Sequence, residues 1–444
     1  MNVLIICQYF PPENKIGAVR PSRIAKYLNR YKDVDVNVLT VEPLGTDSQL
    51  YKDDFNGVAV YRVPVPLFIK RLNSSLSRNG GVSATRIGGI PSNTENNNVQ
   101  RVVLKQRIRS ILFVTREMML NKAYYFGAKR VLRKLNNSFD VVISTYNTEF
   151  GHNVGYWYKK NHPTVKWITD YRDPLFGAYS TPKQKKHGTE FVKRISKACD
   201  AITVVSRGII DIHKDDFDGK PVFLIYNGYD SEDPLPETVL QHDKIVRLVY
   251  TGELYNGRRD LSPLFQAISN LQQDHIIQPE DIEIIYAGKS GDCFVSQISC
   301  FPKIKYTNLG FVSRQDALFL QAGADLLILA SWCEPNEKEV LTGKFFEYLQ
   351  MKKPIICLIS GSASGCRLTK IINEHSLGFS YESESKETDQ ELLRSYIEKQ
   401  VMEKKKHGSV TFVGDNEFVK RFDYQSLTDG FYEIIKSKKQ NTHE

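Results

Sequence analysis

Short apolar segments alternate with amphipathic helical stretches along most of this 444-residue chain. The alternation is typical of parallel α/β domains, because each parallel strand needs a crossover helix before the next strand begins. In the first half we expect seven strands, at 3–7, 36–41, 58–63, 141–145, 166–169, 201–205 and 222–226. Sheets of this kind bind ligands at the carboxyl ends of their strands, so the turns that follow the strands are where chemistry is expected.

The alternation pauses once, and the pause divides the chain. Residues 231–244 begin with an acidic run that contains two prolines and has no periodicity, which we interpret as a linker. A second series follows, with strands expected at 247–250, 282–287, 306–309, 325–329 and 354–358. Since 444 residues exceed what one ordinary core holds, we predict two facing Rossmann-like α/β domains with a cleft between them. Their expected bounds are 1–230 and 245–415, with a C-terminal helix in 416–444.

One segment of the first domain departs from the pattern. Residues 72–100 are rich in Ser, Asn and Gly, a composition that predicts a mobile loop. The stretch 101–134 that follows is helical in pattern and holds ten Lys and Arg against one acid, Glu117. Two interpretations stay open: a helix with a solvated basic face, or a surface that touches an anionic membrane. The formal net charge of +9 favours an anionic partner without identifying it.

Several classes of protein are disfavoured by what the sequence lacks. No run approaches the ~18 apolar residues of a membrane-spanning helix, and the N-terminus does not resemble a signal peptide. We therefore expect a cytoplasmic protein, peripheral at the inner face of the plasma membrane if 101–134 binds lipid. The seven cysteines include no C-x-x-C pair, so neither a metal site nor a disulfide framework is expected. No recognisable nucleic-acid module is present, and we expect no nucleic-acid partner.

The turns after three strands hold the candidate site residues. After the first strand, Gly17 would let the backbone approach a ligand at a helix N-terminus, although a plain strand–helix connection stays open. No G-x-G-x-x-G is present, so a dinucleotide cofactor is not indicated. The strand 166–169 runs into Asp170 and Arg172, charges that either pair with one another or bind sugar hydroxyls. His152 lies after the preceding strand and could face the same place, or could be structural.

The second domain offers the third candidate. The strand 247–250 is followed by Gly252, then by Arg258 and Arg259, and adjacent guanidinium groups suit a diphosphate. After the strand 325–329, Glu339 and Glu347 are separated by seven intervening residues. Between them are Leu341, Thr342, Gly343 and Lys344. We predict that Gly343 opens a short helix whose free N–H groups hold a phosphate, beside the positive charge of Lys344.

These segments together resemble a known family. Tyr9-Phe10-Pro11-Pro12 with Gly17, the turn 170–174, Asn227-Gly228, Tyr250-Thr251-Gly252 and the run 343–349 follow one another as in the retaining glycosyltransferases of family 4. That family has the two-domain GT-B architecture. The resemblance covers nearly the whole chain and implies transfer of a sugar from a nucleotide-sugar donor, with UDP-sugars favoured, to a sugar or lipid-linked glycan acceptor. No metal or resident cofactor is implied, because fixed positive charges can stabilise the leaving diphosphate.

The resemblance also implies a role for each candidate. The C-terminal domain would bind the donor, with Glu347 on the ribose and Glu339 near the transferred sugar. Arg258 or Arg259 would neutralise the diphosphate. The N-terminal domain would hold the acceptor, with Gly17 near the donor phosphates and Arg172 where many relatives carry a histidine.

Two departures from the family pattern concern the donor site. Glu253 stands where a basic residue is common, and Thr342 stands where a glycine is expected. Two alternatives to a glycosyltransferase therefore stay open: a nucleotide-sugar epimerase of the same fold and a non-catalytic binding subunit.

Overall fold

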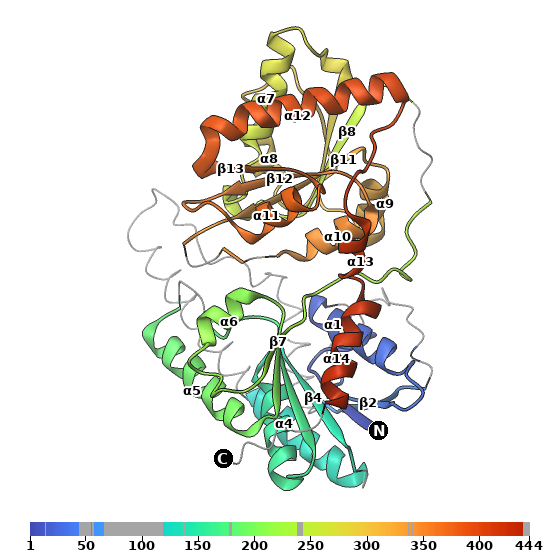
Figure 1. The fold of residues 1–444 in the computed structure, drawn as a ribbon, viewed down its shortest axis with the longest axis vertical. Coiled ribbons are helices and arrows are strands. Elements are labelled where there is room, and N and C mark those ends of the chain that lie inside the picture. The colour runs from blue at the N-terminus through green and yellow to red at the C-terminus, as the bar shows by residue number, and fades with distance from the viewer. Residues whose placement is uncertain are drawn as a thin grey trace, which may run out of the picture. The chain divides into compact units, whose positions relative to one another are not determined.

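The computed structural model describes residues 1–13, 15–43, 55, 57–65, 119–135, 138–176, 180–237, 243–335, 338–339 and 341–437. The chain divides into two compact units, which Figure 1 shows as separate groups of strands and helices. Unit 1 comprises Met1–Val204, His213–Phe223 and Tyr432–Glu444, and unit 2 comprises Val205–Ile212 and Leu224–Phe431. The predicted loop 72–100 and residues 101–118 of the basic stretch lie outside the described residues. The predicted cleft between the domains stays a prediction.

The sheet of unit 1 has seven strands in the order β3-β2-β1-β4-β5-β6-β7. They are β1 (Asn2–Ile6), β2 (Asp35–Val41), β3 (Ala59–Val63), β4 (Val141–Tyr146), β5 (Lys166–Tyr171), β6 (Ala201–Val204) and β7 (Val222–Leu224). The pairs from β3 to β6 are parallel. All seven predicted strands are confirmed. Strands β1, β2, β4, β5 and β6 are buried almost throughout, as expected where helices cover both faces of a parallel sheet.

The helices of unit 1 follow its strands. They are α1 (Ile16–Leu28), residues 119–135, α4 (Glu149–Asn161) and α5 (Pro182–Ala198). The next helix, α6 (Arg207–His213), groups with unit 2 except for its last residue. Helix α5 begins at a capping box between Thr181 and Gln184, with Pro182 at its first position. The strand order reverses on either side of β1, which lies between β2 and β4. The loop from β1 to α1 therefore lies at the point where an open α/β sheet receives ligands.

The sheet of unit 2 has six parallel strands in the order β10-β9-β8-β11-β12-β13. They are β8 (Val246–Thr251), β9 (Ile282–Ala287), β10 (Lys305–Asn308), β11 (Leu326–Trp332), β12 (Ile355–Ser360) and β13 (Gly378–Glu382). The five predicted strands are confirmed, and β13 was not predicted. Its five residues begin with a glycine and end with a glutamate, which leaves too short an apolar run to indicate a strand.

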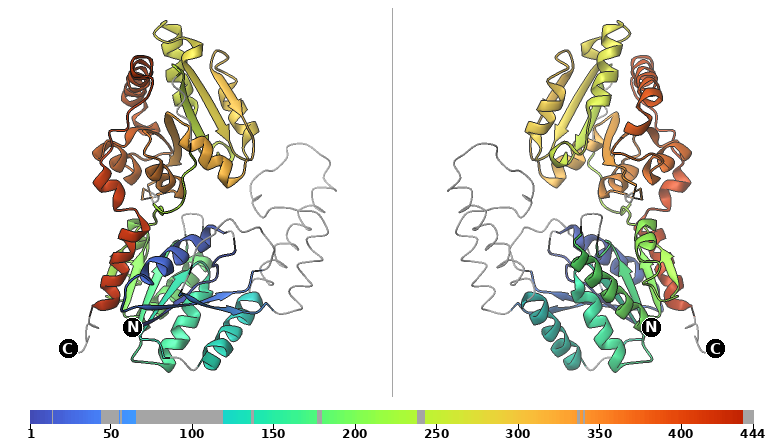
Figure 2. Two further views of the ribbon diagram at one scale, coloured as in Figure 1. Left: turned by 90° about the vertical axis from the view of Figure 1, so that its right-hand side faces the viewer. Right: turned by 90° about the vertical axis from the view of Figure 1, so that its left-hand side faces the viewer.

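Two hydrophobic cores cover the two faces of this second sheet, and Figure 2 shows helices on both of its sides. One core joins the strands to α7 (Ser262–Gln273), α8 (Gly291–Ile298) and α12 (Lys386–His407). The other joins them to α9 (Arg314–Ala322), α10 (Gly343–Met351), α11 (Arg367–Glu374) and α13 (Asn416–Lys420). Because helices cover both faces of the sheet, polar side chains are expected in the loops at the carboxyl ends of its strands.

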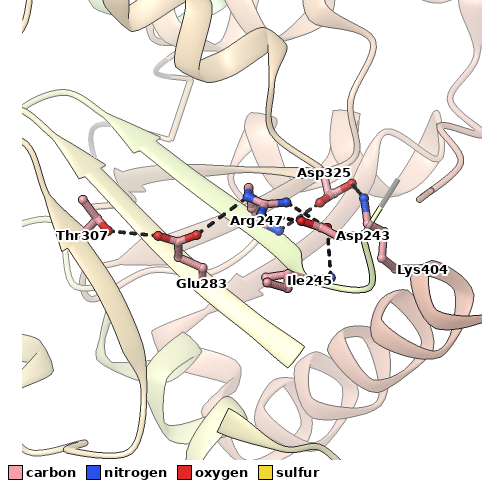
Figure 3. A network of polar contacts seen from close by, with 7 residues as sticks. All are labelled: Asp243, Ile245, Arg247, Glu283, Thr307, Asp325 and Lys404. Atoms are coloured by element: carbon pink, nitrogen blue, oxygen red, sulfur yellow. Dashed lines mark hydrogen bonds and ion pairs between the residues drawn. The ribbon is translucent and has the colours of Figure 1, made fainter. Parts of the chain in front are cut away.

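A polar network holds the opposite, amino edge of this sheet, as Figure 3 shows. Arg247 on β8 donates through both terminal nitrogens to Asp243, at 3.0 and 2.6 Å, and its Nε lies 3.7 Å from Glu283 on β9. The backbone N–H of Arg247 donates to Asp325, whose other oxygen accepts from the buried Lys404 of α12 at 2.9 Å. Charges on this edge are thus paired with one another across β8, β9, α12 and the residue before β11.

The C-terminal segment corrects one prediction. We predicted a single helix in 416–444, but the chain forms α13 and then α14 (Tyr424–Lys436), separated at residues 421–423. Asp415 and Asp423 accept backbone N–H groups at the starts of the two helices. Phe422 between them is buried in the core of unit 2, so the chain turns there to place its ring. Among the residues that the structure describes, no helix is long and apolar enough to cross a membrane.

Candidate functional site

The loop after β8 presents two arginines at the carboxyl edge of the unit 2 sheet. It contains three consecutive residues with positive φ, namely Tyr255 at 49°, Asn256 at 55° and Gly257 at 84°. Non-glycine residues in this region are strained, and such strain persists where the surrounding contacts hold the loop in place. Two contacts of this kind are Leu254 N–H to Ser290 Oγ, at 3.0 Å, and Arg259 Nη1 to the carbonyl of Glu253, at 3.0 Å.

Both arginines lie over one indole ring. Trp332 is the last residue of β11, the strand beside β8 in the sheet. The guanidinium carbon of Arg258 is 4.1 Å from the Trp332 ring centroid, and that of Arg259 is 5.5 Å away. Arg259 also lies 4.6 Å from the ring of Tyr255. The predicted arginine pair is therefore brought together at one place on the sheet edge, with Arg259 largely buried and Arg258 half-buried.

Glu347 lies on α10, in the second turn after its start, and is surrounded by donors. Its carboxylate accepts from Lys344 Nζ at 2.7 Å and from Gln321 Nε2 at 3.4 Å, and Arg314 Nη1 lies 3.5 Å away. Burial raises the pKa of Glu347, but the charges of Lys344 and Arg314 and these hydrogen bonds outweigh it, so the net shift is downward. The carboxylate is therefore ionised at neutral pH and can accept hydroxyl hydrogen bonds. Gln321 also donates to Thr251 Oγ1 at the end of β8, at 2.8 Å.

Helix α10 begins at Gly343, as predicted, and its first turn carries no side-chain cap. A Cβ on Gly343 would meet nothing within 4 Å, so the backbone there is open to a ligand. Near this start in the chain, Ser331 Oγ, Glu339 Oε2 and Thr342 Oγ1 are buried without a hydrogen-bond partner. Uncapped N–H groups favour anions, and buried polar atoms without partners call for a ligand or water. The segment therefore has the properties of a phosphate- and hydroxyl-binding site.

In unit 1, Arg172 contacts the loop that contains Gly17. It donates through Nη1 to the carbonyl of Gly17 at 2.8 Å and through Nη2 to that of Ile16 at 3.3 Å. A Cβ on Gly17 would lie 2.7 Å from Tyr9 and 3.0 Å from Asn147, so this position needs glycine. Arg172 and Gly17 thus come together at the switch point of the first sheet, although Arg172 fixes the loop rather than pointing away from the protein.

Asp170 and His152 do not join them, which corrects the expectation that they face a substrate. Asp170 is fully buried, accepting from Arg20 Nη2 at 2.9 Å and from Thr203 Oγ1 at 2.7 Å. Its carboxylate therefore holds α1 to the sheet. His152 is fully buried and makes a 2.8 Å hydrogen bond with Ser144. Burial lowers its pKa to about 3, with Asp170 opposing that shift, so it is a neutral core residue.

Sequence reasoning missed four residues of the unit 2 site: Tyr255, Arg314, Gln321 and Trp332. Arg314 and Gln321 lie at the start and end of α9, which approaches α10 only in three dimensions. An arginine at a helix start and a glutamine on a buried face gave no local signal. Trp332 lies beyond the strand predicted at 325–329, so its place at the end of β11 was not foreseen. Among the described residues, no group of three acidic, His or Cys side chains is placed to hold a metal ion.

Comparison with known proteins yields matches in structure alone. No protein-family model matches the chain, and no curated protein sequence matches it. The N-terminal domain of Candida albicans trehalose-6-phosphate phosphatase superposes with a TM-score of 0.60 at 11% identity, over 98% of this chain and 96% of that one. The lipopolysaccharide outer core galactosyltransferase WaaB, in its apo form, gives 0.53 at 12% identity, over 98% and 99%.

A third match is the UDP-forming α,α-trehalose-phosphate synthase of Burkholderia xenovorans, with a TM-score of 0.57 at 10% identity over 98% of both chains. Identities this low establish the fold and nothing finer. The two parallel-sheet α/β units of this chain are those of the GT-B fold, as the sequence predicted.

Proposed function

We propose that the chain is a retaining glycosyltransferase, similar to family 4, that transfers a sugar from a nucleotide-sugar donor bound to unit 2. The observation that carries the proposal is the carboxyl edge of the second sheet. There, two arginines, an uncapped helix start and an ionised glutamate follow neighbouring strands. The solved structures with this fold include a galactosyltransferase and a UDP-forming synthase, which supports a nucleotide-sugar donor and favours UDP.

Each group has a separate task in this proposal. Glu347 accepts hydrogen bonds from the ribose hydroxyls, and the N–H groups at Gly343 bind the distal phosphate. Arg258 and Arg259 stabilise the negative charge that grows on the diphosphate as the bond to the sugar breaks. Fixed positive charges that are in place before reaction cost no reorganisation, so they stabilise the transition state more than the ground state. Glu339 faces the transferred sugar, and the acceptor is a sugar or lipid-linked glycan of a bacterial surface polymer.

The first test is the thermal stability of the protein with UDP, GDP, ADP and their common sugar conjugates. A ligand that binds only the folded state adds ~2.7 kcal/mol at 100 times its dissociation constant. We expect one nucleotide class to stabilise the wild type and to lose that effect in Glu347→Ala. Glu391→Ala is the matched control, since Glu391 pairs with Arg394 on the exposed face of α12. A wild type that responds to no nucleotide would rule out the donor site.

Turnover separates the proposal from its alternatives. A transferase releases nucleoside diphosphate faster when an acceptor glycan is added. An epimerase would change the configuration of free nucleotide sugar without acceptor, and a non-catalytic subunit would bind the nucleotide and release nothing. The side chains of Glu253 and Thr342, where the chain departs from the family pattern, are the first to exchange if binding occurs without turnover.

We further propose that unit 1 binds an anionic membrane surface, which places the protein at the cytoplasmic face beside a lipid-linked acceptor. Residues 119–135 form a helix that contains five Lys and Arg and no acid. Leu120, Tyr124, Ala128 and Leu132 form its buried stripe. Its outward stripe mixes cations with apolar side chains: Met119 (57% exposed), Lys122, Phe126 (64% exposed), Lys129 and Arg133. Such a face offers the cations that attract anionic lipids and some of the apolar area on which interfacial binding also depends.

A second element extends this surface. Trp157 of α4 is half-buried, and Lys129 and Arg133 lie 5.2 and 5.5 Å from its ring. Indole rings are favoured at the level of lipid headgroups, where one part is apolar and the other polar. Each Lys or Arg near an anionic surface contributes about 1 kcal/mol. The described half of the basic stretch thus supports a lipid partner better than a solvated face.

Sedimentation with vesicles tests this surface. We expect binding to phosphatidylglycerol vesicles but not to phosphatidylcholine vesicles, and binding roughly 30-fold weaker in Lys129→Ala/Arg133→Ala. Lys183→Ala/Lys186→Ala on α5 removes the same charge elsewhere on unit 1 and is the control. Equal loss in both variants would indicate a net-charge effect, and binding to RNA in place of vesicles would indicate a different partner.

A further inference from the structure

The indole of Trp332 contacts both arginines of the pair, and no part of the proposed function assigns it a task. Of the two guanidinium groups, that of Arg258 lies closer, with its carbon 4.1 Å from the ring centroid, which is within stacking contact. The Tyr255 ring meets the same indole at an interplanar angle of 71° and a centroid distance of 5.7 Å. The indole at the end of β11 therefore contacts both guanidinium groups, and the Tyr255 ring of the loop after β8 contacts that of Arg259.

Stacking on the indole offsets two costs of placing two arginines side by side. Two adjacent arginines repel each other, and each has a long side chain that loses rotamer freedom when it is held in one place. A guanidinium group stacked on a ring is attracted by the π-system through its flat face. Its N–H groups point outward from its edge, so stacking leaves them directed along the plane in which a phosphate is bound. The ring can hold an arginine without using the hydrogen bonds that a diphosphate needs.

The surrounding backbone supports the same arrangement. Trp332 ends β11, and the next residue, Cys333, donates its N–H to Ser360 of β12 at 2.8 Å. Arg259 is held from the other side by the carbonyl of Glu253. The strained turn at Tyr255 and Asn256 places the second ring over Arg259. The backbone at Trp332 thus belongs to the sheet, while the two arginines belong to the loop after β8.

We infer that Trp332 is a positioning residue, which holds the guanidinium groups of Arg258 and Arg259 in the orientation that binds the diphosphate of the donor. The inference rests on the proposed donor site and adds a part of it that acts through the arginines rather than by touching the nucleotide. Trp332 then contributes to the affinity for the phosphate groups of the donor. The nucleoside is bound by the residues of α10.

Affinity for a series of ligands that differ only in phosphate number tests the inference. Calorimetry with UDP, UMP and uridine, or with the guanine or adenine series if the wild type binds those, is run on wild type, Trp332→Leu and Trp332→Phe. Leucine keeps apolar volume without a π-face, and phenylalanine keeps a face. We expect Trp332→Leu to weaken UDP binding roughly 3- to 30-fold while uridine binding stays within twofold, and Trp332→Phe to recover most of the loss. Tyr306→Leu, an exposed aromatic of β10 packed on Phe294, is the matched control.

A second background separates positioning from direct contact. In Arg258→Ala/Arg259→Ala, Trp332→Leu should cause no further loss of UDP binding, because the side chains through which the indole acts are gone. Additive losses would overturn the inference, as would equal losses for UDP and uridine or an unchanged UDP affinity in Trp332→Leu. A wild type that binds no nucleoside diphosphate at all would overturn the donor site itself, and with it this inference.

Discussion

His152 shows how a buried side chain can couple the protein to pH without taking part in chemistry. Its ring lies among Tyr146, Tyr171 and Phe191, with the Tyr171 ring 4.7 Å away. Burial lowers its pKa from 6.5 to about 3. Because the folded state resists the proton that the unfolded state accepts, this residue's contribution to stability is complete above pH 6.5. It is lost progressively as the pH falls from there toward 3.

We therefore expect His152→Phe to flatten the acid side of the stability profile. Between pH 6 and 4 the free energy of unfolding of the wild type should carry a term of about 1.4 kcal/mol per pH unit that the variant lacks. Urea denaturation at a series of pH values measures both slopes, so the variant's absolute stability does not affect the comparison. Identical slopes would show that His152 is protonated in the folded protein.

The positions of the candidate residues were predicted better in unit 2 than in unit 1, and the difference has a physical reason. Arg258, Gly343 and Glu347 are placed by the ends of their own strand or helix, which the local sequence determines. Asp170 sits at a strand end in the same way, but its partner Arg20 is 150 residues distant in the chain. A charged side chain at a strand end is either exposed or buried in an ion pair, and which of the two occurs depends on a partner far away in the sequence. The local sequence pattern does not show that partner.

At the scale of elements, the buried strands β1 and β4 were predicted to within one residue at each end. Such strands have uninterrupted apolar runs. Among the edge strands β3, β7, β10 and β13, only β13 was missed, and the C-terminal segment was predicted as one helix in place of two. At the C-terminus, the helical pattern continues through residues 421–423, but Phe422 is buried there and Asp423 forms a backbone bridge with Tyr229.

The start of α10 leads to a prediction that uses two glycines. Since a Cβ at Gly343 would meet nothing within 4 Å, Gly343→Ala should leave the unliganded protein as stable as the wild type or up to ~1 kcal/mol more stable. The same methyl group would occupy the space in which a phosphate approaches the backbone, so nucleotide stabilisation should fall. Thermal unfolding with and without nucleotide measures both effects.

Gly361 is the contrasting position, because it lies at the end of β12 on the same sheet edge. Its φ is 115°, and a Cβ there would lie 2.2 Å from the carbonyl oxygen of Cys333. Gly361→Ala should therefore destabilise the unliganded protein. Full nucleotide response in Gly343→Ala would mean that no ligand approaches the start of α10.

At the amino edge of the same sheet, the ion pair between Lys404 and Asp325 leads to a further prediction. Lys404 of α12 is buried, and its ammonium group pairs with Asp325 at 2.9 Å (Figure 3). Lys404→Met would leave that carboxylate without its cation, which costs about 3–5 kcal/mol for a buried pair. Lys404→Met/Asp325→Asn should recover part of the loss, as the amide oxygen can still accept the N–H of Arg247. Urea denaturation of the four proteins in this cycle checks it, and additive losses would contradict the pairing.

At the scale of the whole molecule, the chain returns to unit 1 near the end of α14. Residues from Tyr432 onward group with unit 1, although the preceding 200 residues belong to unit 2. The ring of Tyr432 stacks on Tyr31 with centroids 3.8 Å apart, and Lys436 pairs with Asp33. The buried ammonium of Lys166 donates to Ser437 and to the carbonyl of Ile434. A linear division at residue 230 therefore leaves the first unit without contacts that it needs.

Truncation after Phe431 should accordingly destabilise unit 1 while leaving unit 2 intact. Removal of these residues takes away the acceptors that Ser437 and the carbonyl of Ile434 offer to the Lys166 ammonium group, which lowers the stability of unit 1 by roughly 2–3 kcal/mol. Hydrogen exchange should then accelerate in β1, β2 and β5 and stay unchanged in β8 and β11. Lys166→Met in the truncated chain replaces the ammonium group by an apolar side chain and should restore part of the protection, which separates the loss of these hydrogen bonds from the lost stacking of Tyr432. Equal acceleration in both sheets would show instead that the two units unfold as one, and that the C-terminal residues stabilise the whole molecule.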